Sequence, residues 1–420
     1  MPDLWRTRRL LGALAGDAMA ELLGSWHQHA LTLLGIVWGA AAVVLLLSLG
    51  SGFHRNLDLG FKKTGDRYVV AFGQYTTTEL GGARPGRRIA FRREDLARVR
   101  AGAPSARFVA AEVQRASVAA RSRYRTRTAV VSAATPELAQ IKNHRVARGR
   151  FFEEADEHNA RPVAVLGAEL AIALFGERDP LGESLQLDGR PFEVVGVLAR
   201  KGAQYMTNNA PNDQMVFIPL SQGQRLFGLG REVGAIFANP WRVDEASQLE
   251  AELRAALLPF HRVLPEDREA IQTLSVPELT RPFATAALGL EILLGVVGTI
   301  VLAMAGVGVA NLMVALVNRR RIELAMRRAC GARKSDLVTQ LLVETLVVVL
   351  PGGGLGVALG TLAAWALTLV PLPEIVPGPH LEWNVVATAF SVLVIVGLAS
   401  GVVPGRVASR VAPAAALRAG

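Results

Sequence analysis

Side chains that could carry out chemistry are few in this sequence, and their spacing matches no common catalytic motif. The 420 residues contain no GxxxxGK[ST] phosphate-binding loop, no HExxH zinc motif and no GxSxG nucleophile motif. Four carboxylates cluster at Glu153, Glu154, Asp156 and Glu157, but they lack the spacing of an EF-hand. We therefore predict a solvated acidic loop rather than a metal site, and we expect no catalytic residue and no cofactor in this chain.

Cysteine content and charge narrow the class of protein further. The single cysteine, Cys330, rules out an internal disulfide and any zinc or iron–sulfur site built from several cysteines. The formal net charge is +10, yet acidic residues are interspersed with the basic ones, so we predict a solvated surface and no nucleic-acid partner. Hydrophobic residues make up 51% of the chain and are unevenly distributed, which indicates a membrane protein with a polar insert.

The densest basic stretch, residues 319–336, lies between two long apolar segments at 283–317 and 337–370. Each apolar segment is long enough to cross a bilayer. A strongly basic connector between two crossings stays on the cytoplasmic side. Gly331 suits the C′ position that closes a short helix. The stretch is therefore either a charged loop that only fixes orientation or a helix that docks on a cytosolic partner.

Two further crossings are predicted, at 30–50 and 383–403. Residues 1–29 form an amphipathic, arginine-bearing segment that suits a helix on the cytoplasmic membrane surface, and we favour an uncleaved anchor over a signal peptide. A basic tail occupies 404–420. The distribution of arginine and lysine then places both termini in the cytoplasm and the polar insert, 51–281, on the outer side.

The insert mixes helical and strand patterns, so the predicted fold is an α-helical membrane protein with four transmembrane helices and a large extracytoplasmic α+β domain between the first two. Two lobes are expected, the outer one inserted at about 135–231. Asp188-Gly189 between alternating runs indicates a hairpin. Periodicity predicts strands and helices at the following residues: strands at 67–72, 107–120, 124–132, 162–166, 184–187, 191–198 and 234–238, and helices at 94–101, 168–175 and 244–258.

Small residues recur at four-residue spacing in two of the crossings. Gly35 and Gly39 form one such pair, and Gly352, Gly356 and Gly360 form a longer series. Glycines at this spacing let a neighbouring helix approach closely. We therefore predict that both sets pack against other transmembrane helices.

A few residues interrupt the apolar pattern of the crossings. Pro351 removes a backbone donor and predicts a kink. Asn311 is expected to form a hydrogen bond between helices. Glu291 and Glu344 are ionisable groups inside predicted crossings, which suggests a function by default. We favour structural roles, with Glu291 at the outer interface and Glu344 paired with an arginine near the inner one.

Motif blocks occur in order along nearly the whole chain. They are Asn311-Leu312-Met313 followed by RIELAMRRACGA at 321–332, LLGIVWG at 33–39, GRFF at 149–152, VAVLG at 163–167, LFG at 174–176, PLG at 180–182, VVGV at 194–197, and Pro404 followed by PAAALR at 413–418. Together they resemble FtsX-like permeases, the MacB-type subunits of ABC transporters, with a MacB-type periplasmic core domain. Departures from that pattern are Ala325 for a glycine, Cys330 for an aliphatic residue, and Ala412 and Ala415 where Asp and Glu are common.

The resemblance implies that residues 319–336 form a coupling helix that inserts into a groove of a cytosolic ABC ATPase. That ATPase would bind ATP and Mg²⁺, and we expect it on a separate chain because the ATPase domain of MacB is missing here. The residues that would couple to it are Arg321, Glu323, Arg327, Arg328, Gly331 and Arg333.

The resemblance also implies a homodimer, or a heterodimer with a related permease, in the bacterial inner membrane. Such a permease would act as a mechanotransmitter that drives export of a peptide, antibiotic or lipoprotein, together with a periplasmic adaptor and an outer-membrane duct or carrier. Two alternatives within the family are the lipoprotein-release branch and the cell-division branch that activates wall hydrolases. An alternative from another class is a membrane-anchored sensor or scaffold without transport.

Overall fold

The computed structural model separates the chain into two compact units, Met1–Asn56 with Ala286–Gly420, and Leu57–Thr285. We call them the membrane unit and the large domain. Residues 1–25 of the predicted surface helix (1–29) and residues 410–420 of the predicted basic tail lie outside the described residues. The structure describes residues 26–65, 67–78, 85–202, 204, 209–370 and 378–409.

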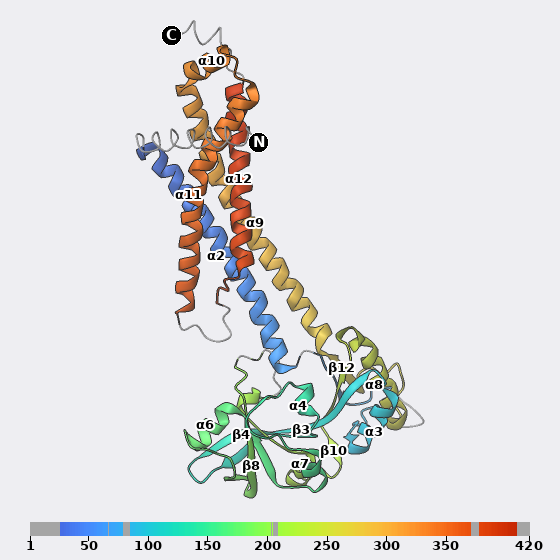
Figure 1. The fold of residues 1–420 in the computed structure, drawn as a ribbon. Helices are drawn as coiled ribbons and strands as arrows, with labels where there is room; N and C mark the ends of the chain where they lie inside the picture. Colours follow the sequence, from blue (N-terminus) through green and yellow to red (C-terminus); the bar gives the residue numbers. More distant parts are fainter. Residues whose placement is uncertain are drawn as a thin grey trace, which may run out of the picture. The chain divides into compact units, whose positions relative to one another are not determined.

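Four long helices contribute to the membrane unit, and each is long and apolar enough to cross a bilayer. They are α2 (Trp26–Thr64), α9 (Val276–Arg319), α11 (Lys334–Thr368) and α12 (Trp383–Ser409), and the short α10 (Arg321–Ala329) separates α9 from α11 (Figure 1). The predicted four transmembrane helices, with a large domain between the first two, are confirmed. Helix α11 continues through Pro351 without ending there.

Glycines bring α11 into close contact with α2. A Cβ atom built on Gly356 would lie 2.4 Å from the carbonyl oxygen of Val37, and one built on Gly360 would lie 2.8 Å from that of Ala41. Both separations are shorter than van der Waals contact, so no larger residue fits without moving a helix. A Cβ atom built on Gly352 would lie 3.1 Å from the Cδ2 atom of Leu33, also in α2. The glycine series of α11 therefore lies against the first crossing.

The GxxxG pair of α2 is divided between two environments. Gly39 lies against α9, because its Cβ would come 3.3 Å from the Cδ1 of Leu302. Nothing among the described residues lies within 4 Å of the corresponding position at Gly35. Within this chain, therefore, only Gly39 of the pair contacts another helix.

The large domain is built on a ten-stranded mixed sheet with the order β12-β1-β11-β3-β4-β9-β6-β8-β5, in which β7 pairs with β3 and β8. Pairs β4–β9 and β6–β8 are parallel, and the other pairs are antiparallel. A separate ribbon joins β2 and β10. The strands are β1 (Val69–Gly73), β2 (Phe91–Arg92), β3 (Ala106–Arg121), β4 (Thr126–Ala134), β5 (Val146–Gly149), β6 (Val163–Leu166), β7 (Ser184–Leu187), β8 (Arg190–Leu198), β9 (Met215–Pro219), β10 (Glu232–Val233), β11 (Ala235–Pro240) and β12 (Ile271–Ser275).

Helices cover this sheet and fill its hydrophobic cores. In β1, Val69 and Ala71 belong to the core shared with α3 and α8, whereas Val70 between them belongs to a different core. Alternate residues of a strand point to opposite faces, so both faces of β1 are covered. The helices of the domain are α3 (Arg93–Gly102), α4 (Leu138–Ile141), α5 (Glu154–His158), α6 (Ala168–Phe175), α7 (Leu220–Phe227) and α8 (Ala246–His261).

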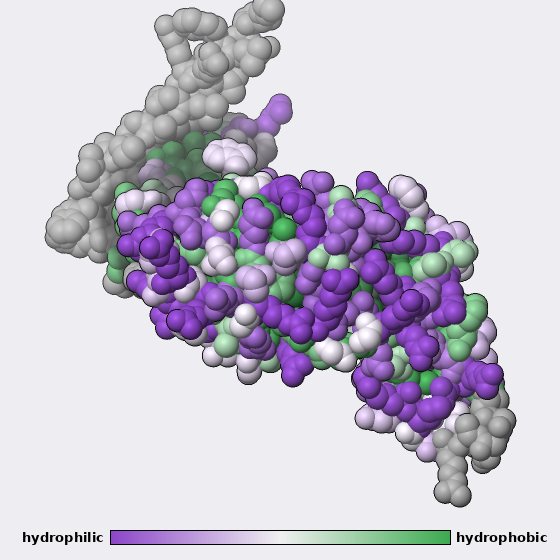
Figure 2. All heavy atoms as spheres, turned by 90° about the horizontal axis from the view of Figure 1, so that it is seen from below, coloured by the Kyte–Doolittle hydropathy of each residue, from purple (hydrophilic) through white to green (hydrophobic). Residues whose placement is uncertain are grey.

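One sheet runs through the whole insert. The segment 135–231 contributes β5 to β9, and it joins the strands from the ends of the insert where β9 pairs with β4 and β7 pairs with β3. The predicted hairpin is present, since Asp188 and Gly189 have φ angles of 45° and 82°, both in the left-handed region that a type I′ turn requires. Figure 2 shows a mostly hydrophilic face of the domain.

Candidate functional site

Helix α10 is a separate nine-residue element with well-defined ends. Its C-terminus has the hydrogen bonds of a Schellman motif, because the N–H of Gly331 donates to the carbonyl of Arg328 and that of Ala332 donates to the carbonyl of Arg327, each at 3.1 Å. Gly331 has a φ of +99°, which glycine adopts without strain. The predicted closing role of Gly331 agrees with this geometry. Figure 1 shows α10 at one end of the membrane unit.

One side of α10 is buried in a small hydrophobic core. Leu324 is 4% exposed and packs with Val317 of α9, Leu337 and Leu341 of α11, and Ala408 of α12, and Ala325 beside it in α10 is 0% exposed. Ala325 is the position at which the family pattern has glycine. The side chain at this position is fully buried.

A chain of polar contacts links α10 to α11. Arg327 donates to Glu323 one turn earlier and to the side-chain oxygen of Gln340 in α11, both at 2.7 Å. Gln340 donates in turn to Glu344 at 2.9 Å, and Glu344 lies 3.7 Å from Arg320. Glu344 is therefore paired with an arginine, Arg320, as predicted from the sequence. Arg327 therefore forms contacts within this chain, although its side chain is 42% exposed.

The remaining predicted coupling residues lie on the same segment but in different surroundings. Arg328 donates to the backbone carbonyl of Ser409, at the end of α12, at 3.4 Å. The backbone N–H of Arg333 donates to the carboxylate of Asp336 at 3.0 Å, which caps the start of α11. Arg321 is exposed. The structure thus brings these residues into one segment and gives several of them contacts that hold α10 in place.

Sequence reasoning missed the exposed apolar side chains of α10. Ile322 and Met326 are each 49% exposed. Residues four apart lie on the same side of a helix, so these two form one apolar patch. An apolar pair at this spacing inside a basic segment is visible in the sequence, but only the burial of Leu324 and Ala325 shows which side of the helix remains open. We call Ile322 and Met326 the α10 patch.

Two polar residues of the other crossings occupy distinct positions. Glu291 of α9 lies beside Gly50 of α2, where a built Cβ would be 3.2 Å from the Cα of Glu291. Asn311 is exposed on α9. Ile300, Met304 and Val307 of the same helix are exposed as well, at 56%, 71% and 60%. Asn311 therefore lies on a surface of α9 that the other described residues leave open.

The acidic cluster of the large domain differs from its prediction as a solvated loop. Asp156 and Glu157 are each 1% exposed, and only Glu153 and Glu154 face solvent. Asp156 accepts a 2.6 Å hydrogen bond from Arg150, which lowers the pKa of that carboxyl group, while burial raises the pKa of Glu157. The prediction was wrong for these two carboxylates because α5 turns them towards neighbouring arginines and α7.

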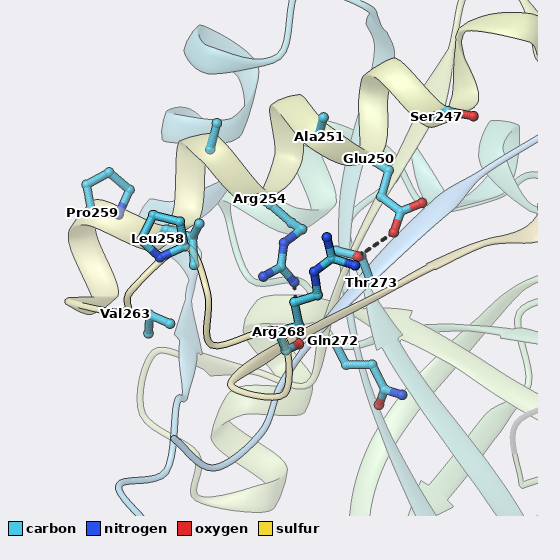
Figure 3. A pocket seen from close by; sticks show the side chains of 12 residues that line it. Ser247, Glu250, Ala251, Arg254, Leu258, Pro259, Val263, Arg268, Gln272 and Thr273 are labelled. Atoms are coloured by element: carbon cyan, nitrogen blue, oxygen red, sulfur yellow. Dashed lines mark hydrogen bonds between the residues drawn. The ribbon is translucent and has the colours of Figure 1, made fainter. Parts of the chain in front are cut away.

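The cavity shown in Figure 3, of about 870 Å³, lies along α8 and β12. Thr273 of β12 donates to Glu250 of α8 at 2.6 Å, and Arg254 donates to the backbone carbonyl of Ile271. Leu258, Pro259 and Val263 form an apolar part of its wall. Its polar side chains hold α8 to β12, which is a structural role.

The large domain also contains a buried ion pair that sequence reasoning did not find. Glu112 of β3 is 3% exposed and accepts from Lys142 at 2.6 Å, Ser132 at 2.5 Å and Gln114 at 2.9 Å. Burial raises the pKa of Glu112, but the charge of Lys142 and these hydrogen bonds outweigh it and keep that pKa below its ordinary value. Thirty residues separate the two partners, and no local sequence pattern links them.

Comparison with known proteins identifies a known domain family in each of two parts of the chain. Residues 29–256 match the MacB-like periplasmic core domain, and residues 295–413 match the FtsX-like permease C-terminal domain. The chain belongs to the MacB-type, FtsX-like family of ABC transporter permeases. As in that family, four transmembrane helices accompany a large extracellular domain between the first and the second.

Relatives of this MacB-type permease align over almost its whole length. It is 31% identical over 398 residues to the macrolide export ATP-binding/permease protein MacB of Nitrosomonas europaea, covering 93% of this chain and 56% of the relative. It is 32% identical over 418 residues to the pyoverdine export ATP-binding/permease protein PvdT of Pseudomonas syringae pv. syringae, covering 96% of this chain and 60% of the relative. The chain thus spans little more than half the length of these relatives.

Among solved structures, the periplasmic region of MacB from Actinobacillus actinomycetemcomitans aligns with a TM-score of 0.42 and 16% identity. The alignment covers 53% of this chain and 95% of that one.

Proposed function

We propose that this chain is the membrane-spanning permease of an ABC exporter and that α10 is the element on which a cytosolic ABC ATPase docks. The observation that supports this most directly is the two-sided character of α10. Its α10 patch is open, whereas Leu324 on the other side is packed among α9, α11 and α12. An exposed apolar patch on a short helix outside the bilayer is typical of a protein–protein contact.

The contacts of α10 suggest how motion of the ATPase would reach the rest of the permease. Arg327 joins α10 to α11 through Gln340, and Arg328 joins it to the end of α12. Helix α9, which directly precedes α10, begins at Val276, immediately after the last strand of the large domain. A displacement of α10 would therefore act on three helices, and α9 leads from the cytoplasmic side to the extracellular domain. In this proposal the ATPase binds ATP and Mg²⁺, and this chain acts as a mechanotransmitter that passes the motion of the ATPase to the extracellular domain.

A second permease copy, identical or related, would complete the membrane part. Asn311 carries two amide donors and a carbonyl acceptor on an open surface of α9, where lipid chains offer no hydrogen-bonding partner. A neighbouring permease that packs on this surface would supply one. We therefore propose a dimer in which α9 contributes to the interface.

The direction of transport is proposed from the relatives, which are named for macrolide export and for pyoverdine export. By analogy, this permease would drive export of a peptide, antibiotic or lipoprotein. It would lie in the bacterial inner membrane with both termini in the cytoplasm, and it would work with a periplasmic adaptor and an outer-membrane duct or carrier.

The test is co-purification with a candidate ABC ATPase, followed by measurement of ATP hydrolysis. In the decisive variant, Ile322→Glu/Met326→Glu, charges replace the α10 patch without touching Arg327, whose removal would also disturb Gln340. We expect at least a tenfold loss of retained ATPase, since each exposed anchor that loses its contact costs about 1–2 kcal/mol.

The matched control is Ile172→Glu, which makes the same kind of change at a 64% exposed isoleucine on α6 of the large domain. It should retain the ATPase like the unmodified protein. Equal retention by the α10 variant and this control would contradict docking at α10, and the anchored sensor or scaffold would then be the better interpretation. Size-exclusion profiles of all variants check that the permease remains folded.

A further inference from the structure

The turn that follows strand β11 exposes a tryptophan on the large domain. Trp241 is 61% exposed, and Val243, two residues further along, is 45% exposed. A large apolar side chain in water gains free energy when another surface covers it. The indole also carries one polar N–H group, so it suits a surface that is apolar on one side and hydrated on the other. We call residues 241–245 the tryptophan turn.

The pairing of the strands places the tryptophan turn at the end of the sheet that bears both connections to the membrane. Val69, the first residue of β1, pairs with Ala238 of β11 on one side and with Ser275, the last residue of β12, on the other. Trp241 follows Ala238 by three residues. Helix α9 begins directly after Ser275, and α2 ends a few residues before Val69. Both helices therefore join the sheet at the end where Trp241 lies.

This end of the sheet is close to the bilayer along the chain. Phe283, where the predicted crossing 283–317 begins, is seven positions after Val276, the first residue of α9. Seven positions correspond to about 10 Å along a helix. The ring of Phe283 also lies 6.0 Å from that of Phe61, so α2 and α9 run side by side here. The headgroup layer extends about 5–7 Å beyond the hydrocarbon core, so a lipid surface is within a few helical turns of the tryptophan turn.

Hydrogen bonds hold the backbone of the tryptophan turn in place. The backbone N–H of Trp241 donates to the carbonyl of Ser105 at 3.2 Å, which ties the turn to the start of β3. Arg242 donates through two guanidinium nitrogens to the carboxylate of Asp244, each at 3.0 Å, and its backbone N–H donates to Glu245 at 3.2 Å. Because this backbone is already ordered, covering the indole costs little further conformational entropy.

The charges of the tryptophan turn and of Arg107 beside it balance one another. Arg107 and Arg242 are positive, and Asp244 and Glu245 are negative. These four side chains have no net charge that would select an acidic or a basic protein partner. The guanidinium of Arg107 lies 5.4 Å from the centre of the Trp241 ring, a distance typical of a cation–π contact. An indole with a guanidinium beside it suits the headgroup layer, where tryptophan is enriched and arginine extends its charge towards water.

We propose that Trp241 is an interfacial anchor, which inserts into the lipid headgroup layer on the outer side of the membrane and holds this end of the large domain against it. The occupant of the exposed surface is then the membrane that the same chain crosses. The proposal is independent of ATPase docking at α10 and of the nature of any exported substrate. It gives the large domain a lipid contact in addition to its two helical connections.

The test measures the tryptophan fluorescence of the full chain in phosphatidylcholine nanodiscs. Two quenchers are compared, namely bromine atoms on the lipid acyl chains close to the headgroup and acrylamide in the water. Subtracting the emission of the variant Trp241→Phe from that of the unmodified protein isolates the emission of Trp241, because the other five of the six tryptophans are common to both.

The matched control introduces an exposed tryptophan at the other end of β3. Tyr124 is 41% exposed and lies in the turn between β3 and β4, whereas the start of β3 is next to Trp241. The 16 residues of β3 span up to about 50 Å. The emission of this control tryptophan is the difference between the variants Trp241→Phe/Tyr124→Trp and Trp241→Phe.

Brominated lipid should quench Trp241 severalfold more than the control tryptophan, and acrylamide should quench it severalfold less. If brominated lipid quenches Trp241 no more than the control, the proposal is wrong. Quenching of Trp241 by acrylamide would in that case show that the indole faces water, and protection from both quenchers would show that a protein surface, such as a second copy of this chain, covers it. Circular dichroism checks that all variants are folded.

Discussion

The membrane unit and the large domain hold their interiors together by different means. In the membrane unit, Gly356 and Gly360 let the backbones of α2 and α11 approach closely. In the large domain, Glu112 and Lys142 form a buried ion pair. Lipid provides no hydrophobic drive between helices, so packing depends on shape. In the large domain the sheet places Ser132 and Gln114 next to Glu112, and these partners make a buried charge tolerable.

The largest expected effect comes from breaking the ion pair of the large domain. Glu112→Gln leaves Lys142 buried with a neutral partner, so we expect the free energy of unfolding to fall by about 3–5 kcal/mol. Thermal or denaturant unfolding of the full chain in detergent measures the change. The double variant Glu112→Leu/Lys142→Met removes both charges and should lose far less. Equal losses in the two variants would show that shape, rather than charge, holds this part of the domain as well.

A smaller effect is expected from a single methyl group in the membrane unit. Gly356→Ala places a Cβ against the carbonyl oxygen of Val37, and we expect a loss of about 1–3 kcal/mol. A Cβ built on Gly354 of the same helix meets none of the described residues within 4 Å, so Gly354→Ala should be neutral or slightly stabilising. Thermal unfolding of both variants in detergent provides the measurement. If they shift the transition equally, close packing of α2 on α11 does not control the stability of this unit.

The third prediction concerns the pH dependence of the stability of the large domain. Asp267 is 2% exposed, and burial raises its pKa, but hydrogen bonds from Thr77 and Thr78 outweigh this and lower the pKa to about 2. The folded-state pKa lies below the ordinary value, so the stabilisation is present above about pH 4 and is lost as pH falls through 2.

We expect that loss to be about 2 kcal/mol in the large domain. The variant Asp267→Asn should be destabilised at neutral pH and should lack this part of the acid dependence. Asp179, an exposed partner of Arg148, provides the control Asp179→Asn, which should change stability by less than about 0.5 kcal/mol. The measurement is the free energy of unfolding of the unmodified protein and of both variants between pH 2 and pH 7. An unchanged acid dependence in Asp267→Asn would assign the acid sensitivity to other groups.

Much of the fold could be predicted from local patterns in the sequence. The apolar runs predicted the four crossings, and Asp188-Gly189 predicted the hairpin of β7 and β8 because that turn requires two positive φ angles. Strand β9 was missed. All five of its residues are buried, so it has no alternation of polar and apolar side chains from which a strand could be recognised.

The candidate site was predictable only in part, because its contacts join distant segments. The arginine-rich stretch 319–336 predicted a basic connector between two crossings, and Gly331 predicted the C-terminal end of a short helix in it. The link from Arg327 to Gln340 and the open side of Ile322 depend on how α10 folds back on α11, which no local pattern encodes. The same limit applies to Asp156 and Glu157, whose acidic neighbours suggested solvent exposure.

The lone thiol of the sequence makes this protein unusually simple to label for spectroscopy. Cys330 is exposed and directly follows the last residue of α10. Because it is the single cysteine in 420 residues, a maleimide fluorophore or spin label would attach at one position per chain, without prior removal of other thiols. Changes in emission or in spin mobility would then follow the surroundings of α10 through a catalytic cycle of any ATPase added to the unmodified sequence.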